Sequence, residues 1–195
     1  MKTLINFLAF ITLFTNVAIA QVSWTVDPAH TNARFEAKHL GIAFVDGQFT
    51  KLEGKVSTSS DTDFNNAKVN FSIDVNSIDT RVEMRDNHLK SDDFFSAEKF
   101  PTMKLANAVL TGKNGKFSLT GDLTIRDVTK KVTFDVVQNN GIITDPWGKT
   151  RAGFTAKTSI NRFDYGISYS DKLPSGVFAV APEINIIVNV EITKD

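Results

Sequence analysis

After residue 20, apolar and polar residues alternate along most of the chain, which is typical of β-strands with one buried face. The clearest run contains Val69, Phe71, Ile73 and Val75, which polar positions separate. Similar apolar rows start at residues 33, 117, 132, 154 and 184, and turns rich in Gly, Asn, Asp and Pro lie between them. About eight strands joined mostly by short turns predict an up-and-down antiparallel β-barrel, with a β-sandwich as the alternative.

Two stretches fit this pattern less well. Residues 47–57 switch register between Phe49 and Val56, and we expect a bulge or bend near Gly54 to reconcile the two halves. Residues 57–66 are polar and acidic, which predicts a surface loop.

A single segment, residues 79–101, departs from the strand pattern altogether. Thr80 and Glu83 are spaced as in a capping box, in which the hydroxyl and the carboxylate each bind a free backbone N–H at the start of a helix. Positions 84, 85, 88 and 89 then share one helical face. These signals predict a helix over about residues 81–91. In an otherwise all-β chain, we expect it to lie near the barrel mouth as a plug or lid, followed by Phe94 and Phe95.

The N-terminal 20 residues have the features of a secretory signal peptide. Lys2 precedes a mostly apolar run over residues 4–14, and Ala18-Ile19-Ala20 fits the small-residue pattern of a cleavage site. The run is shorter than the ~20 residues that span a bilayer, which favours a cleaved leader over a membrane anchor. We therefore expect a signal peptide at residues 1–20, one domain at residues 21–195, and export to the periplasm.

Composition excludes several classes of function. The chain has 22 basic and 22 acidic residues, so nothing favours binding to nucleic acid. It has no cysteine, and therefore no disulfide, thiolate nucleophile or cysteine-ligated zinc. It also lacks a nucleophile elbow, a P-loop and a dinucleotide fingerprint. Its three histidines have no metal-ligand spacing, and we expect His30 to order a turn. The sequence thus predicts a protein that is not an enzyme and needs no metal or cofactor.

Several motifs follow one another along residues 24–166. They are WTVDPAHT at 24–31, FEAKHLG at 35–41, RDNHLKSDDFF at 85–95, GDLTI at 121–125 and RFDYG at 162–166. This ordered set resembles the YceI-like family of secreted lipid-binding proteins, with Thr31 where serine is usual. The resemblance implies an extended lipocalin-like antiparallel barrel in the periplasm. It also implies a cavity for a long apolar chain, such as a polyisoprenoid quinone precursor or a fatty amide.

The inward rows and the helix together define a predicted lipid pocket. The chain has 16 phenylalanines against two tyrosines and two tryptophans, so its aromatic surface is largely apolar. A solid phenylalanine-rich core is the alternative to a cavity. His39 continues the row of Phe35 and Ala37, where a hydrogen-bonded core histidine is the ordinary outcome. The predicted pocket residues are Phe35, Ala37, His39, Phe71, Ile73, Met84, Leu89, Phe94, Leu119, Leu123, Phe134, Phe154, Ile186 and Val188.

Three polar residues of the helix are candidates for binding a lipid head group. Arg85, Asp86 and His88 would hydrogen-bond a phosphate, carbonyl or amide at the cavity mouth. Alternatively, they pin the helix to the barrel rim through backbone carbonyls. Two other functions stay open: an isomerase or hydrolase that uses Asp86 and His88, and a stress-related scaffold with a filled core. The expected partner is an amphiphilic lipid, and transient membrane contact and a homodimer also stay open.

Overall fold

The computed structural model describes residues 21–195, so the predicted signal peptide lies outside the described residues. Its helices are the α-helix α1 (Glu83–Lys90) and two short 3-10 helices, η1 (Val75–Ser77) and η2 (Arg162–Tyr165). The strands are β1 (Val22–Val26), β2 (Asn32–His39), β3 (Ala43–Phe49), β4 (Leu52–Thr58), β5 (Ala67–Asp74), β6 (Ile78–Asp79), β7 (Thr102–Lys113), β8 (Lys116–Ile125), β9 (Val128–Thr144), β10 (Thr150–Asn161) and β11 (Val180–Lys194).

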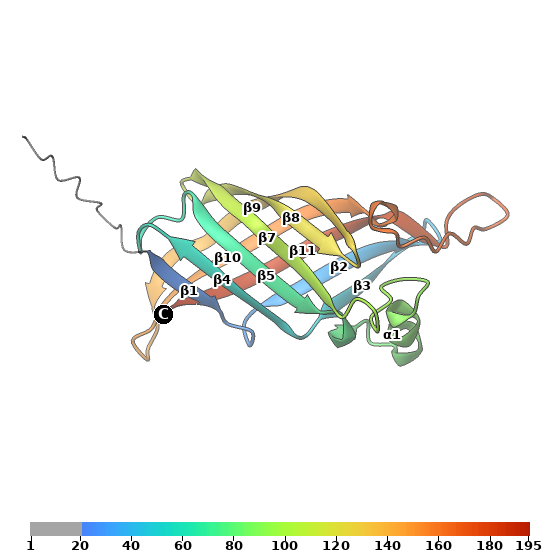
Figure 1. Ribbon diagram of the computed structural model, residues 1–195, viewed down its shortest axis with the longest axis horizontal. Coiled ribbons are helices and arrows are strands. Elements are labelled where there is room, and N and C mark those ends of the chain that lie inside the picture. Colours follow the sequence, from blue (N-terminus) through green and yellow to red (C-terminus); the bar gives the residue numbers. More distant parts are fainter. Residues whose placement is uncertain (1–20) are drawn as a thin grey trace, which may run out of the picture.

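The strands form a closed eight-stranded antiparallel barrel, which confirms the predicted fold (Figure 1). β1 and β2 act as one interrupted strand, because Trp24 and Asn32 lie opposite Lys194 and Asn189 of the same neighbour, β11. β3 and β4 likewise act as one strand, since β3 pairs with β2 and β4 pairs with β1. With β5 and β7–β11 in chain order, the barrel is an up-and-down meander closed between its first and last strands.

The expected bend near Gly54 is wrong, because Gly54 lies within β4. The interruption falls at Thr50 and Lys51, whose backbone N–H groups donate to the carbonyl and hydroxyl oxygens of Ser77, at 3.2 and 3.0 Å. Gly54 instead permits close packing, since a Cβ there would lie 2.8 Å from side-chain atoms of Phe71 and Val26.

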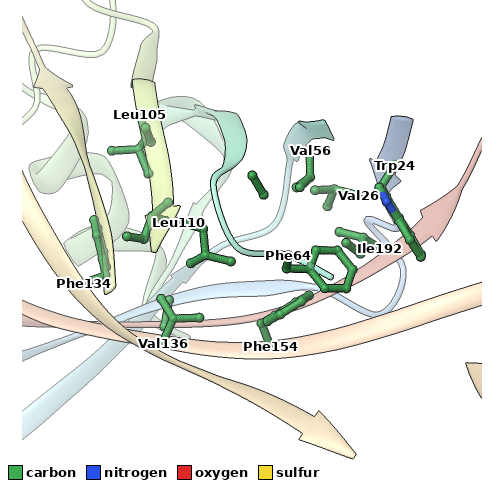
Figure 2. Packing of buried hydrophobic residues seen from close by; sticks show 14 of the residues in the cluster. Trp24, Val26, Val56, Phe64, Leu105, Leu110, Phe134, Val136, Phe154 and Ile192 are labelled. Carbon is green, nitrogen blue, oxygen red and sulfur yellow. The ribbon is translucent and has the colours of Figure 1, made fainter. Parts of the chain in front are cut away.

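Two apolar clusters line the barrel interior. At one end, the ring of Phe64 packs at steep angles against those of Trp24 and Phe154, with centroids 5.1 and 4.9 Å apart, and we call these three residues the plug (Figure 2). The Trp24 indole donates to the Thr58 hydroxyl at 3.3 Å, so the one polar atom of the plug is satisfied. At the other end, the second cluster includes Phe49, Val75, Ile78, Phe94 and Tyr165.

Residues 80–101, which contain α1, cover the second end, and we call this segment the lid (Figure 1). The helix occupies residues 83–90, within the predicted range, but none of its residues is buried. Among residues 21–195, no helix is long and apolar enough to cross a membrane. The lid is therefore held by its flanking residues and its polar contacts more than by an apolar helix face.

Candidate functional site

An apolar cavity lies inside the barrel between the plug and the lid. Its volume is about 190 Å³, and its lining is apolar except for Arg34, Lys104 and Arg162. Cross-strand pairs build its wall, since Phe71 of β5 lies opposite Leu105 of β7, and Leu119 of β8 lies opposite Phe134 of β9. The apolar residues at every second position thus form the inner surface of the barrel, and their side chains leave part of the interior empty.

The size of the cavity limits what it holds without rearrangement. An engineered cavity of about 150 Å³ in another protein binds benzene, so about 190 Å³ accepts a guest only somewhat larger. A longer chain requires lining side chains or the lid to move. One lining ring, that of Phe35, packs directly on Gly47, where a Cβ would be 2.2 Å from the ring.

Most of the predicted pocket residues line this cavity, although their contact with a ligand stays a prediction. The cavity-lining members of the predicted set are Phe35, Phe71, Ile73, Leu119, Leu123, Phe134, Phe154, Ile186 and Val188. Ala37 is buried on the same inner row but is not part of the lining. Leu89 and Phe94, which belong to the lid, pack in the second apolar cluster.

Two members of the predicted pocket are misplaced. His39 is exposed at the end of β2, so the predicted pocket position and the alternative of a hydrogen-bonded core histidine are both wrong. Its row leaves the barrel there, next to the irregular pairing of β2 with Val180 and Ile184 of β11. Met84 on α1 is 83% exposed, because the helix turns that side chain away from the barrel.

Arg85 and Asp86 fasten the lid to Thr80 rather than facing the cavity. Arg85 donates to the hydroxyl and the carbonyl oxygen of Thr80 at 2.8 and 2.6 Å. The Asp86 carboxylate accepts from the backbone N–H of Thr80 at 2.8 Å and from its hydroxyl. The geometry therefore matches the alternative in which these residues pin the helix.

The predicted capping box between Thr80 and Glu83 is wrong. Arg81 has a left-handed backbone, with φ of 66°, and this turn separates Thr80 from the helix. Val82 is the N-cap residue and makes no side-chain capping bond. Thr80 is buried instead, and its hydroxyl is shared between Arg85 and Asp86.

His88 connects the lid to the loop at residues 167–179. Its Nε2 lies 3.0 Å from the Asp93 carboxylate. Its ring stands edge-on to Phe94 and Tyr169, with centroids 5.0 and 5.6 Å away. Phe94 and Tyr169 are themselves 4.9 Å apart. His88 therefore belongs to an aromatic contact between lid and loop, outside the cavity wall.

Sequence reasoning missed two arginines at the lid end. Arg162 is 3% exposed and donates to the carbonyls of Ile167, Val180 and Ala181, at 2.8, 2.9 and 3.1 Å. Burial lowers the pKa of its guanidinium. Arg126 donates to the carbonyls of Gly166 and Phe94, at 2.6 and 3.4 Å, and so joins η2 to the lid. The RFDYG motif marked the position of Arg162 but gave no indication of its contacts.

Comparison with known proteins identifies the family of this chain. The model of the YceI-like domain matches residues 24–192. The chain belongs to the YceI-like family. This confirms the resemblance drawn from the ordered motifs.

Three known proteins illustrate what this chain is similar to. A UPF0312 protein of Shewanella denitrificans is 37% identical over 85% of this chain and 87% of its own length. The crystal structure of a Campylobacter jejuni YceI protein is 29% identical, with a TM-score of 0.65 over 81% of this chain and 90% of that one. A polyisoprenoid binding domain from Saccharophagus degradans shares the fold, with 13% identity and a TM-score of 0.63 over 89% of this chain and 99% of that one.

The opening motif of this YceI-like chain forms an ionic anchor beside the plug. Arg151 donates to the carboxylates of Asp145, Asp27 and Glu191 at 2.6, 2.8 and 2.6 Å. His30 lies 2.9 Å from Asp27 and orders the bend between β1 and β2, as expected. Hydrogen bonds from His30 and Arg151 lower the pKa of Asp27 to about 2. Ligand atoms of Asp27, His30 and Glu191 are close enough to hold a cation, but the Arg151 guanidinium already donates to both carboxylates.

Proposed function

We propose that this protein is a periplasmic binding and carrier protein for an amphiphilic lipid with a long apolar chain. A polyisoprenoid of the quinone-precursor type fits best, and a fatty amide is the second choice. The observation that carries the proposal is the apolar cavity between a buried plug and a polar-fastened lid. The fold shared with a polyisoprenoid binding domain supports it.

The wall determines what such a cavity recognises. Burial of each CH₂ contributes about 0.8 kcal/mol, so one five-carbon isoprene unit contributes about 3–4 kcal/mol before entropy costs. Since the lining is apolar apart from Arg34, Lys104 and Arg162, and Arg162 is engaged by carbonyls, chain shape is read more strongly than the head group. A chain of several units requires the cavity to enlarge, so lining side chains or the lid would have to move.

The structure offers little support for the enzymatic alternative. Asp86 binds Thr80 and His88 binds Asp93, and neither residue lines the cavity. A hydrolase or isomerase that used this pair would need its substrate outside the apolar interior. A wholly filled scaffold is disfavoured by the cavity itself. We therefore propose binding and delivery rather than catalysis.

Uptake of prenyl probes by delipidated, detergent-free protein tests the proposal. We expect saturable uptake by the wild type. Ala156→Phe, on the cavity wall, should weaken uptake at least about tenfold, since it fills the space that one isoprene unit would occupy. Val109→Phe, at an exposed position on β7, is the matched control and should leave uptake unchanged. Folded wild-type protein without saturable uptake, or an Ala156→Phe variant with normal affinity, contradicts the proposal.

The export prediction has a separate test. N-terminal sequencing of the protein recovered from the periplasmic fraction of its host should begin at Gln21. A mature protein that keeps residues 1–20, or that fractionates with the cytoplasm, contradicts the periplasmic assignment.

A further inference from the structure

Two chain segments present apolar side chains to solvent at the lid end of the barrel. We call residues 39–44, at the turn between β2 and β3, and residues 172–178, in the loop before β11, the tip surface. Ile42 is 84% exposed and Phe44 58% exposed, and Leu173 and Val177 are also exposed. Large apolar side chains exposed together in this way mark an interaction site.

The tip surface is continuous and preformed. The backbone N–H of Leu40 donates to the carbonyl of Ala179 at 3.0 Å. A Cβ at Gly41 would lie 3.1 Å from Val177, so the two segments touch. Within the second segment, Leu173 N–H donates to the Val177 carbonyl at 2.8 Å, and Lys172 pairs with Phe178 as an isolated bridge. In Figure 1 this orange-red loop projects beyond the barrel at the end where α1 lies.

Two lysines flank these apolar side chains. The Lys38 ammonium lies 5.9 Å from the centroid of the Phe44 ring, and that of Lys172 lies 4.4 Å from the centroid of the Phe178 ring. Nearby carboxylates have other partners, since Asp171 accepts from the Tyr169 hydroxyl at 3.0 Å and Asp46 lies 3.9 Å from Arg81. Within residues 21–195, neither lysine forms an ion pair. Apolar side chains that project between cations match the layered chemistry of an anionic lipid surface.

We propose that the tip surface docks the protein on a bilayer that contains anionic phosphate head groups. Ile42, Phe44 and Leu173 enter the apolar boundary, while Lys38 and Lys172 meet the phosphates. This inference deepens the proposed carrier function and rests on it, because a bilayer is where such a lipid is collected or delivered. The loop that carries Leu173 also carries Tyr169, which packs on Phe94 of the lid. The docked surface therefore lies next to the lid.

A fluid lipid surface fits better than a second copy of the chain. A stable protein interface buries about 800 Å² on each partner with matched shapes, whereas two projecting segments with four exposed apolar side chains offer much less. Insertion into a bilayer requires no complementary surface. Recognition by a second copy becomes an outcome of the test.

Flotation with phosphatidylcholine vesicles, with and without phosphatidylglycerol, tests the docking. Wild type should bind, and more strongly when phosphatidylglycerol is present. Ile42→Ser with Leu173→Ser should weaken binding at least about tenfold, because one inserted side chain is lost from each segment. Ile143→Ser with Trp147→Ser, exposed apolar residues of the β9–β10 region, is the matched control and should bind normally. Thermal unfolding should show that both variants fold.

Uptake of prenyl probes in vesicle-free solution separates this inference from the proposed function. The tip variant should keep normal uptake and lose only vesicle binding. If all proteins fail to take up probes, the carrier function fails, and vesicle binding is judged by flotation alone. Any of four results overturns the docking. Three concern flotation: none for the wild type, normal flotation of the Ile42→Ser, Leu173→Ser variant, or loss of flotation in the control variant. The fourth is a wild type and a control variant that are dimers in solution while the Ile42→Ser, Leu173→Ser variant is a monomer.

Discussion

The plug and the lid close the same barrel with different physical means. The plug buries Trp24 and Phe64 almost completely, and its single polar atom is satisfied within the barrel. The lid combines an α-helix with no buried residue, polar bonds around Thr80, and a segment after the helix that buries Phe94 and Ala97. Regions with few buried apolar contacts open at lower free energy than a packed core. We therefore expect the plug to stay closed and the helix of the lid to open first.

Removal of a plug ring should have the largest effect on stability. Phe64→Ala should reduce the free energy of unfolding by about 3–5 kcal/mol, since a large, fully buried side chain is lost and leaves a void. Urea denaturation measures this change. Phe44→Ala, at a mostly exposed position, is the control and should change stability by no more than about 0.5 kcal/mol. Equal effects of the two substitutions would show that the plug is not a packed closure.

Loss of the Thr80 hydroxyl should loosen the lid while the barrel stays intact. Thr80→Val removes the acceptor for Arg85 and the donor to Asp86, at a cost of about 1–3 kcal/mol. Hydrogen exchange should become faster over residues 83–100, whereas the amides of β8 and β9 should keep their protection. Thr120→Val, at a solvent-facing threonine pair on β8, is the matched control. Faster exchange over the whole barrel, or none in the lid, contradicts a separately opening lid.

Acid should weaken the ionic anchor around Arg151, with a smaller effect on the free energy of unfolding than the loss of a plug ring. The pKa of Asp27 falls from its ordinary value of 3.8 to about 2 in the folded protein. A lowered folded pKa gives stability that is fully present above the unfolded value. That stability is lost as the pH falls from about 4 to about 2, and it amounts to at most about 2 kcal/mol.

Denaturation curves across that pH range should show that the free energy of unfolding of the wild type falls with pH. The free energy of unfolding of Asp27→Asn should depend less steeply on pH. Asp127→Asn, at an exposed turn position, is the control and should keep the wild-type dependence. If the free energy of unfolding had the same pH dependence in all three proteins, Asp27 would not stabilise the anchor through its lowered pKa.

The barrel and much of its cavity wall were predictable, because a period of two converts residue order directly into an inner and an outer face. Phe71, Leu119 and Phe134 follow that rule and line the cavity. His39 does not, because the same alternation continues past the point where the barrel ends. A pattern of alternation reports the face of a strand but not where the enclosed space stops.

The plug and the lid contacts were beyond local patterns. Phe64 lies in a polar loop, where no periodicity indicates that one ring folds into the barrel. Thr80 and Glu83 have the spacing of a capping box, but the left-handed turn at Arg81 redirects Thr80 to Arg85 and Asp86. The volume of the cavity depends on how all inward side chains pack together, which no single row determines.

Native mass spectrometry of the protein purified from its own host without detergent tests whether the barrel carries a lipid. We expect a discrete non-covalent lipid adduct on the wild type and its loss from Ala156→Phe, whose added ring fills the cavity. An adduct-free wild type that also takes up no prenyl or acyl chain, or an adduct that persists unchanged in Ala156→Phe, would contradict this expectation.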